Sequence, residues 1–548
     1  MNKPAAPDST PQQEASDTKP AERLNDPRDV VYPPARPAIV RSEGATASER
    51  YLAKLAERSF LNLWCYPNVF IDKKSGGKGD GKELCDLLVV CGDDVLIFSD
   101  KSIAWPGGTD EDLAWKRWAR RAIAKSVDQI RGAERLIAKC PDRIFIDPKC
   151  TQKLPIALPP VERRKVHGIV VALGAGNACR KHFGEGIGSL FISPTVKGKD
   201  HWEGDSVMPF MIGDVDPDGP FVHVLDDATL DIVMQELDTI SDLTGYLSRK
   251  ERFIRSGKLM CAAGEEDLVA YYMTHMSPEG VHDFTAPDGS HIKDNNFISL
   301  NSGFHEEMLA NPQYKAKKQA DEPSYVWDRL IEAFTNNMLA GTSLVPDGQK
   351  ADLASMEEGI RHMALVPRYM RRLLGEAILG ALEKGASTDR FTRACVPGPT
   401  EVNQDTAFFF MTVAPPKFVL AGGYEQYRTV RRNMLEAYAL ALLQRNPKQK
   451  RVVGIATEPP AKVGKEGSSE DLIVVEQPTW TAELLADLEE RKTVFNIMQE
   501  GNFTEYAVQG NEFPEVQRRR EVVIPPGLNR RERRRLEAEA RRRQKKGR

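Results

Sequence analysis

Two short apolar runs joined by a tight turn constrain the fold of this chain more than any other feature. Residues 84–90 and 95–100 are rich in Val, Leu and Ile, and residues 92–94 between them read Gly-Asp-Asp. Apolar runs of this length around such a turn predict an antiparallel β-hairpin. Symmetric pairing about the turn places Asp86 opposite Asp100, at the open end of the hairpin.

The segments around this hairpin extend it into a mixed α/β domain. Apolar residues at helical spacing predict a helix over 48–64, and a short strand follows at 69–71. A long helix is predicted over 112–138 and a buried strand over 166–173. Further elements are expected at 190–192 (strand), 221–225 (strand) and 228–254 (helix). The order helix, three strands, helix, strand indicates one domain, which we place at 47–283.

The rest of the chain divides into three segments. Residues 1–46 contain eight prolines and few large apolar residues, so we expect them to be disordered. Weaker patterns over 284–510 predict a second α+β domain. Its expected helices are 325–338, 356–384, 424–444 and 481–498, and its expected strands are 408–413, 452–457 and 472–475. Residues 511–548 form a basic tail: from residue 517 onward, 14 Lys/Arg against 4 Glu give +10, which leaves −13 for the remainder of a chain whose net charge is −3.

The overall composition excludes several classes of protein. With 41% apolar and 28% charged residues, the chain is neither fibrous nor globally disordered, and no apolar run approaches the roughly 20 residues of a membrane helix. Eight cysteines at irregular spacing, without a Cys-x-x-Cys pair, argue against a zinc finger and a disulfide scaffold. Because the N-terminus also has no apolar signal segment, we expect a cytoplasmic protein. A homo-oligomer is left open.

Charged and polar residues are expected to gather at the open end of the hairpin. Asp86 begins one strand, Asp100 and Lys101 end the other, and Glu57 can reach them from the preceding helix. Gln129 lies on the long helix that follows. Grouped carboxylates repel one another, and a hard divalent cation is the usual compensation. A lysine beside such a metal can orient or activate a water molecule.

This arrangement resembles the PD-(D/E)XK nuclease superfamily, which has the restriction-endonuclease-like fold with an αβββαβ core. The resemblance covers less than a quarter of the chain. It implies a Mg²⁺- or Mn²⁺-dependent endonuclease that cleaves DNA in preference to RNA, of a kind that would suit bacterial defence. The metal ligands it implies are Glu57, Asp86 and Asp100. Lys101 would act on the attacking water, and Gln129 would help to orient the site.

One residue departs from the pattern of that superfamily. Ser99 stands two positions before Lys101, where the family has Asp or Glu. In a regular strand Ser99 and Lys101 point to one face and Asp100 points to the other. We therefore predict a local bulge that turns Asp100 toward the site. The alternative is a non-catalytic nucleic-acid-binding or scaffold protein on a nuclease fold that has lost its activity.

Basic residues cover one broad side of the helix predicted over 112–138. They are Lys116, Arg117, Arg120, Arg121 and Lys125. Such a row is either a solvated face or a surface that contacts phosphates, and we expect a nucleic-acid interface. The basic tail would add contacts that do not depend on nucleotide sequence.

Three acids in the second domain flank two predicted strands: Glu458, Glu470 and Asp471. They form either a separate acidic site or, as is commoner, surface acids at loop ends.

Overall fold

The computed structural model describes most of the chain between residues 36 and 515. The described ranges are 36–72, 81–108, 110–184, 186–343, 352–398, 405–414, 424–459, 469–507 and 510–515. The expected disorder of 1–35 and the basic tail from 516 onward lie outside them. Residues 36–46 are packed, contrary to the expectation of disorder up to residue 46: the Ile39 amide donates to the Leu339 carbonyl at 2.8 Å. No helix of the described ranges is long and apolar enough to cross a membrane.

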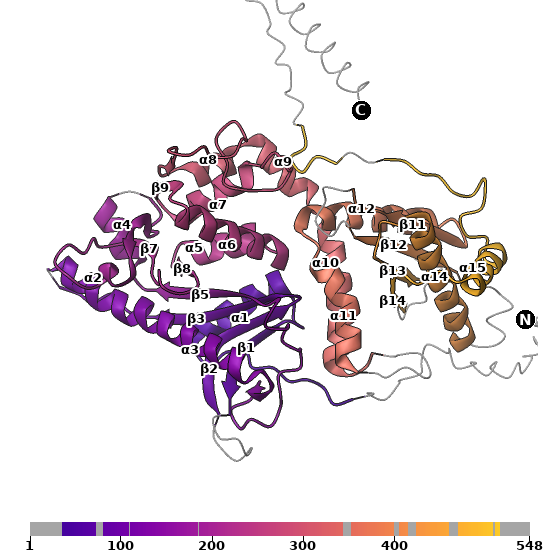
Figure 1. The fold of residues 1–548 in the computed structure, drawn as a ribbon, viewed down its shortest axis with the longest axis horizontal. Coiled ribbons are helices and arrows are strands. Elements are labelled where there is room, and N and C mark those ends of the chain that lie inside the picture. Colours follow the sequence, from indigo (N-terminus) through magenta and orange to yellow (C-terminus); the bar gives the residue numbers. More distant parts are fainter. Residues whose placement is uncertain are drawn as a thin grey trace, which may run out of the picture.

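The N-terminal part of the chain is built on a six-stranded mixed sheet (Figure 1). Its strands are β1 (Cys65–Ile71), β2 (Lys82–Cys91), β3 (Asp94–Ser102), β4 (Ile144–Phe145), β5 (Lys165–Leu173) and β8 (Val222–Asp226). Their order across the sheet is β4-β1-β2-β3-β5-β8. β1, β2 and β3 form an antiparallel meander, and β5 and β8 continue the sheet in parallel with β3. The predicted α/β class is confirmed, and the short β4 is inserted into the predicted order.

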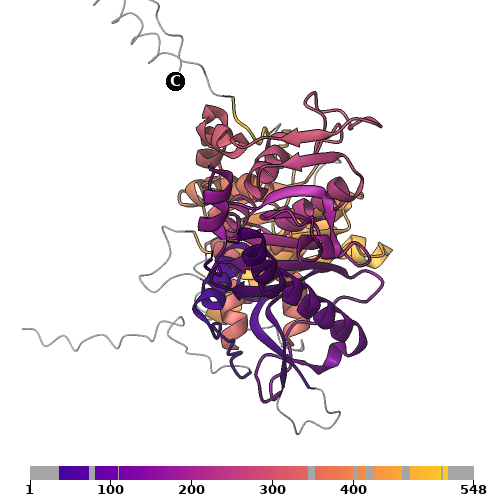
Figure 2. The same ribbon diagram turned by 90° about the vertical axis from the view of Figure 1, so that its left-hand side faces the viewer.

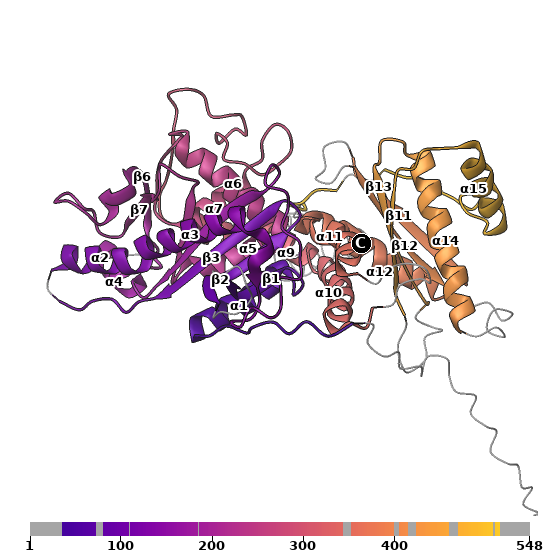
Figure 3. The same cartoon turned by 60° about the horizontal axis from the view of Figure 1, so that its bottom comes forward.

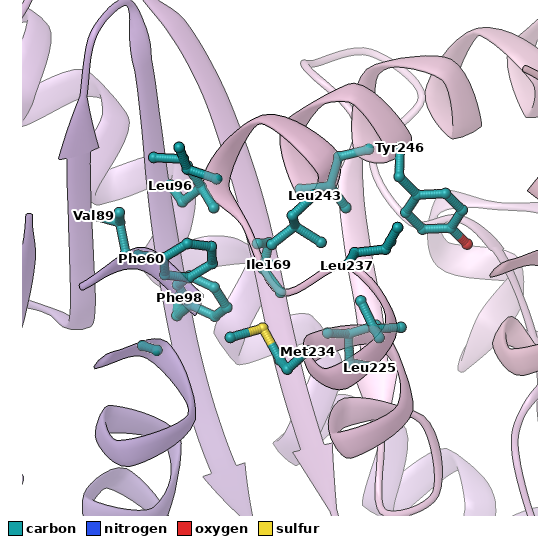
Figure 4. Close-up of a cluster of buried hydrophobic side chains, with 14 of the residues drawn as sticks. Phe60, Val89, Leu96, Phe98, Ile169, Leu225, Met234, Leu237, Leu243 and Tyr246 are labelled. Atoms are coloured by element: carbon teal, nitrogen blue, oxygen red, sulfur yellow. The ribbon is translucent and has the colours of Figure 1, made fainter. Parts of the chain in front are cut away.

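Different helices cover the two faces of this sheet. They are α1 (Ala47–Phe60) on one face and α2 (Glu111–Ala119) with α3 (Lys125–Lys139) on the other, and a π-helical turn (Arg120–Ala124) joins α2 to α3. The ring of Phe60 on α1 lies 6.4 Å from that of Phe98 on β3. The helix expected over 48–64 ends at Phe60 because Leu61 adopts a positive φ of 65°. On the α1 face, Phe98, Ile169 and Leu243 belong to one buried cluster (Figure 4).

A second sheet lies next to the first (Figure 2). Its strands are β6 (Phe191–Lys197), β7 (Met211–Asp214), β9 (Leu259–Ala262) and β10 (Ile298–Leu300), in the order β10-β9-β6-β7. The helices of this part of the chain are α4 (Gly176–Phe183), α5 (Thr229–Glu236), α6 (Ile240–Arg255) and α7 (Glu265–Thr274). α6 contacts β7 and α7 contacts β9, whereas α5 contacts α1 and β8 of the first sheet. The single helix expected over 228–254 is thus divided, because Thr239 caps the start of α6. β10 pairs with β9, so this sheet extends across the domain boundary expected at residue 283.

Helices separate these sheets from a third sheet (Figure 3). The helices are α8 (Phe304–Ala310), α9 (Pro312–Ala320), α10 (Ser324–Ala340), α11 (Leu353–Ala364) and α12 (Arg368–Gly385). The sheet has the order β11 (Arg390–Cys395), β12 (Thr406–Val413), β13 (Arg451–Thr457) and β14 (Asp471–Glu476). It packs against α14 (Tyr424–Arg445) and α15 (Ala482–Val494). The helix expected over 356–384 is interrupted just before α12 by Pro367.

Candidate functional site

The hairpin of β2 and β3 sets the geometry of the candidate site. The last residue pair at its open end is Leu87 with Phe98, so Asp86 lies beside Ser99. Symmetric pairing about the turn predicts Asp86 opposite Asp100, one residue further along. The difference arises at the turn, where Cys91 already pairs with Asp94 and only two residues remain between the strands.

On the face toward α3, four side chains form one bonded group. Asp86 is 4% exposed, and its Oδ2 accepts from the Asp100 amide at 2.6 Å and from Lys101 Nζ at 3.3 Å. Asp86 Oδ1 accepts from Gln129 Nε2 at 3.4 Å. The Ser99 hydroxyl donates to Gln129 Oε1 at 3.1 Å. The structure therefore brings together Asp86, Lys101 and Gln129, with Ser99 as the fourth member.

Lys101 makes a second contact that bears on cation binding. Its ammonium group also donates to the main-chain carbonyl oxygen of Asp100 at 3.2 Å. The ammonium thus bridges a carboxylate oxygen and a carbonyl oxygen, which are both ligand types that Mg²⁺ accepts. The Lys101 side chain is 29% exposed, so solvent and solutes can reach this side of the group.

On the opposite face of the same strand, Asp100 points toward α1. β3 pairs with β5 in unbroken register from Asp94 to Ser102, so the predicted bulge is absent and Asp100 does not turn toward Asp86. The Asp100 carboxyl group is 5% exposed, and neither oxygen has a hydrogen-bond partner. Burial raises its pKa to about 6, and the nearby carboxylates of Asp86 and Glu49 act in the same direction. The neighbouring Ser48 hydroxyl acts in the opposite direction and limits this rise in the pKa.

The acid that α1 contributes near Asp100 is Glu49. Asn68 Nδ2 donates to Glu49 Oε2 at 2.9 Å and to Glu83 Oε1 at 3.0 Å, so one amide joins two carboxylates. Burial alone would raise the pKa of Glu49, but hydrogen bonds from Asn68 and from the amides of Ala45 and Thr46 outweigh it and lower this pKa. Burial raises the pKa of Glu83, and Asp86 adds to the rise. Glu49 and Glu83 were not identified from the sequence.

Glu57 lies elsewhere on α1. Its carboxylate pairs with Arg41 Nη2 at 2.9 Å, and Arg41 also donates to the Cys65 carbonyl. It lies eight residues after Glu49, or about 12 Å along the helix axis at 1.5 Å per residue. Within the described ranges, no hydrogen bond or ion pair joins Glu57 to Asp86 or Asp100, and no group of three or more His, Cys, Asp or Glu is placed to hold a metal ion. The expected three-acid metal site is therefore not assembled.

The expected cationic row is present on α2 and α3. Arg117, Arg120, Arg121 and Lys125 are exposed, Lys116 is half-buried, and none of them forms an ion pair with another described residue. In the π-helical turn the Lys125 amide donates to the Arg120 carbonyl, five residues back. Lys125 lies one turn before Gln129, so the row of unpaired cations leads to the bonded group at Asp86.

The acids of the third sheet have partners. Asp471 pairs with Arg428 at 3.0 Å and accepts from Arg431 Nε at 2.6 Å. Glu458, which is 3% exposed, accepts from the Tyr424 hydroxyl at 2.5 Å. These contacts tie the first turns of α14 to the strands, which is a structural role.

Comparison with known proteins gives no further guide to function. A scan against protein-family models, a search of curated proteins and a search of solved structures each found no match to this chain. The contacts of Asp86, Lys101 and Gln129 are therefore the main evidence on what the site does.

Proposed function

We propose that the N-terminal part of this protein is a metal-dependent nuclease that hydrolyses phosphodiester bonds of DNA. The observation that carries the proposal is the bonded group of Asp86, Lys101 and Gln129 at the open end of the hairpin. The order α1, β1, β2, β3, α2–α3, β5 is also the order on which the resemblance to PD-(D/E)XK nucleases depends. Two kinds of observation, residue placement and element order, thus support the same assignment.

The ligand set is small, and this suits Mg²⁺ or Mn²⁺ that binds together with the substrate. Mg²⁺ usually keeps several waters and is held by one or two carboxylates plus substrate phosphates. Here the Asp86 carboxylate and the Asp100 main-chain carbonyl would hold it, since both oxygens already contact the Lys101 ammonium. When bound, the ion would stabilise negative charge on the reacting phosphate.

The remaining side chains would position the Asp86 carboxylate and a water molecule and bind the substrate. Gln129 holds the Asp86 carboxylate from α3 and is itself held by Ser99. Lys101 would orient a water molecule or stabilise charge on the phosphate. The cations of α2 and α3 would bind the phosphate backbone of the substrate beside the site.

A cleavage assay tests this function. The parent protein is incubated with plasmid, linear and single-stranded DNA, with and without Mg²⁺ or Mn²⁺. We expect metal-dependent cleavage by the parent and its loss in Lys101→Met. The matched control is Lys165→Met, because Lys165 is an exposed lysine at the opposite end of the sheet, where it pairs with Asp94. Absence of cleavage by the parent with either metal would contradict the proposal.

A second candidate is a non-catalytic nucleic-acid-binding protein on the same framework. It is favoured by Ser99, which occupies the position of the second acid and is hydrogen-bonded to Gln129. A Ser99→Asp variant would place a second carboxylate beside Asp86. If the parent binds DNA without cleaving it, and the variant gains Mn²⁺-dependent thermal stabilisation, the second candidate is the correct one.

A further inference from the structure

The chain after α15 returns across the molecule as a strap without regular secondary structure. We call residues 499–507 together with 510–515 the strap; in Figure 1 it runs from α15 toward α9. The Arg445 guanidinium on α14 lies 4.8 Å from the centre of the Phe503 ring. The Arg393 guanidinium on β11 lies 5.3 Å from the Tyr506 ring. The strap therefore contacts the third sheet before it reaches the middle helices.

The end of the strap contacts a group of cationic side chains. The Glu512 carboxylate pairs with His282 Nε2 at 2.9 Å and with Lys317 Nζ at 3.3 Å. Arg372 on α12 donates to the main-chain carbonyls of Asn511 at 2.8 Å and Glu512 at 3.1 Å. The side chains of Lys317 and Arg372 are only 5% and 4% exposed. We call the site formed by His282, Lys317 and Arg372 the Glu512 groove.

Two further contacts depend on the shape of the docked residues and not only on their charge. The Phe513 ring lies 5.9 Å from the Lys317 ammonium and 6.4 Å from the His282 ring. At Gly510, an added Cβ would lie 2.0 Å from the Tyr369 hydroxyl oxygen, so a side chain there would force a shift. The groove thus accommodates a small residue, an acid and an aromatic ring in a fixed order.

The charge balance of the groove requires the acid of the strap. Apart from Glu512, the nearest carboxylate is that of Asp321, which contacts Lys317 at 2.8 Å and Arg372 at 3.2 Å, while Asp242 acts from further away. Burial would raise the pKa of Glu512, but His282 and Lys317 outweigh burial and lower it to about 2. The carboxylate therefore docks in its charged form. Without it, buried cations would lack part of their compensation.

We propose that the Glu512 groove is a peptide-recognition site for a Gly-Asn-Glu-Phe segment, and that the structure shows it loaded with the chain's own residues 510–513. The docked segment is short and irregular, and its ends at Gly510 and Glu515 are exposed. No helix or strand includes this segment, so its leaving the groove breaks its own contacts and no regular secondary structure.

A peptide-binding experiment on the full chain tests this proposal. The double variant Glu512→Ala/Phe513→Ala empties the groove, and its folding is checked by near-ultraviolet circular dichroism. A fluorescent peptide of residues 507–516 should bind the double variant saturably and the parent at least tenfold more weakly, because the parent groove is occupied. A control peptide carrying Glu512→Lys should not bind. A folded double variant without saturable binding would overturn the proposal.

A single substitution keeps the test decisive if the double variant fails to fold. Glu512→Gln retains the shape of the side chain and removes its charge. The fluorescent peptide should then bind this variant at least tenfold more tightly than the parent, because its docked segment has lost the charge that pairs with His282 and Lys317 and is more easily displaced. Equal peptide binding by the two proteins would show that the segment is a permanent part of the core.

Discussion

Neighbouring residues of β3 have contrasting environments on the two faces of the strand. On the face toward α3, Ser99 and Lys101 are bonded to Gln129 and Asp86. On the face toward α1, Asp100 is as deeply buried as Asp86, but its carboxyl oxygens have no hydrogen-bond partner. The alternation of a regular strand produces this difference, because β5 holds β3 in register. One face is thus organised in advance for binding or chemistry, and the other contains a carboxyl group whose ionisation is costly.

The largest effect is expected on the α3 face, from Asp86→Asn. The amide keeps the shape of the side chain but removes the charge that Lys101 contacts and that a metal would need. If the proposed nuclease function is correct, single-turnover cleavage should fall on the order of 10³-fold, as when a group that stabilises transition-state charge is lost. Asp93→Asn, in the turn at the other end of the hairpin, is the control. Cleavage by Asp86→Asn at the parental rate would remove the distinction between the two faces.

The α1 face should respond to Asp100→Asn through stability. The folded-state pKa of about 6 exceeds the ordinary 3.8, so the folded protein retains this proton as pH rises from about 4 to 6. The parent therefore loses stability over that window, by up to about 3 kcal/mol at 1.36 kcal/mol per pKa unit. The variant lacks this loss and should be the more stable protein above pH 6. Urea unfolding at pH 4 and pH 7.5 measures the free energy of unfolding of both proteins. The prediction is contradicted if the difference between them is the same at the two pH values.

The cationic row tests whether the α3 face leads to nucleic acid. A triple variant, Arg117→Gln/Arg121→Gln/Lys125→Gln, should weaken DNA binding about tenfold or more at low salt. The slope of log K against log salt should fall by about 0.9 for each DNA phosphate that the variant no longer neutralises. The control is Arg135→Gln/Lys139→Gln, two exposed cations further along the same helix. Binding measured by anisotropy at several salt concentrations checks this, and an unchanged slope would assign the row to a solvated surface.

The smallest effect is expected from Ser99→Ala. It removes one hydrogen bond to Gln129, with a stability change of about 1 kcal/mol. Cleavage should change less than about threefold, because Asp86 still bonds to Lys101 and the Asp100 amide. Parallel measurements of urea unfolding and cleavage rate check both statements. A loss as large as that of Asp86→Asn would make the hydroxyl an essential part of the site.

The sequence predicts those parts of the site that local patterns determine. It does not predict those that depend on contacts with segments far away in the chain. The proximity of Asp86 and Lys101 follows from two apolar strands and a short turn, whereas Gln129 is implied by the resemblance to PD-(D/E)XK nucleases. Glu57 is indicated by its place at the border of the apolar face of the first helix and by the resemblance. The sequence signal for Glu49 is different, since it forms a capping box with Thr46. The predicted bulge was wrong because the register of β3 is set by β5, about 70 residues later. The strap has no periodicity, so only the folded groove shows where it docks.

The position of the strap in the chain has a consequence for the order of folding. The contact between His282 and Glu512 joins residues 230 positions apart. During synthesis, His282, Lys317 and Arg372 are made long before residue 512, so the middle helices first assemble with cations that lack part of their counter-charge. Closing so long a loop costs conformational entropy and slows folding, so we expect the strap to dock last. In a chain that ends before residue 512, these cations would still lack part of their counter-charge. The helices that the strap joins therefore reach their full stability only when the strap is complete.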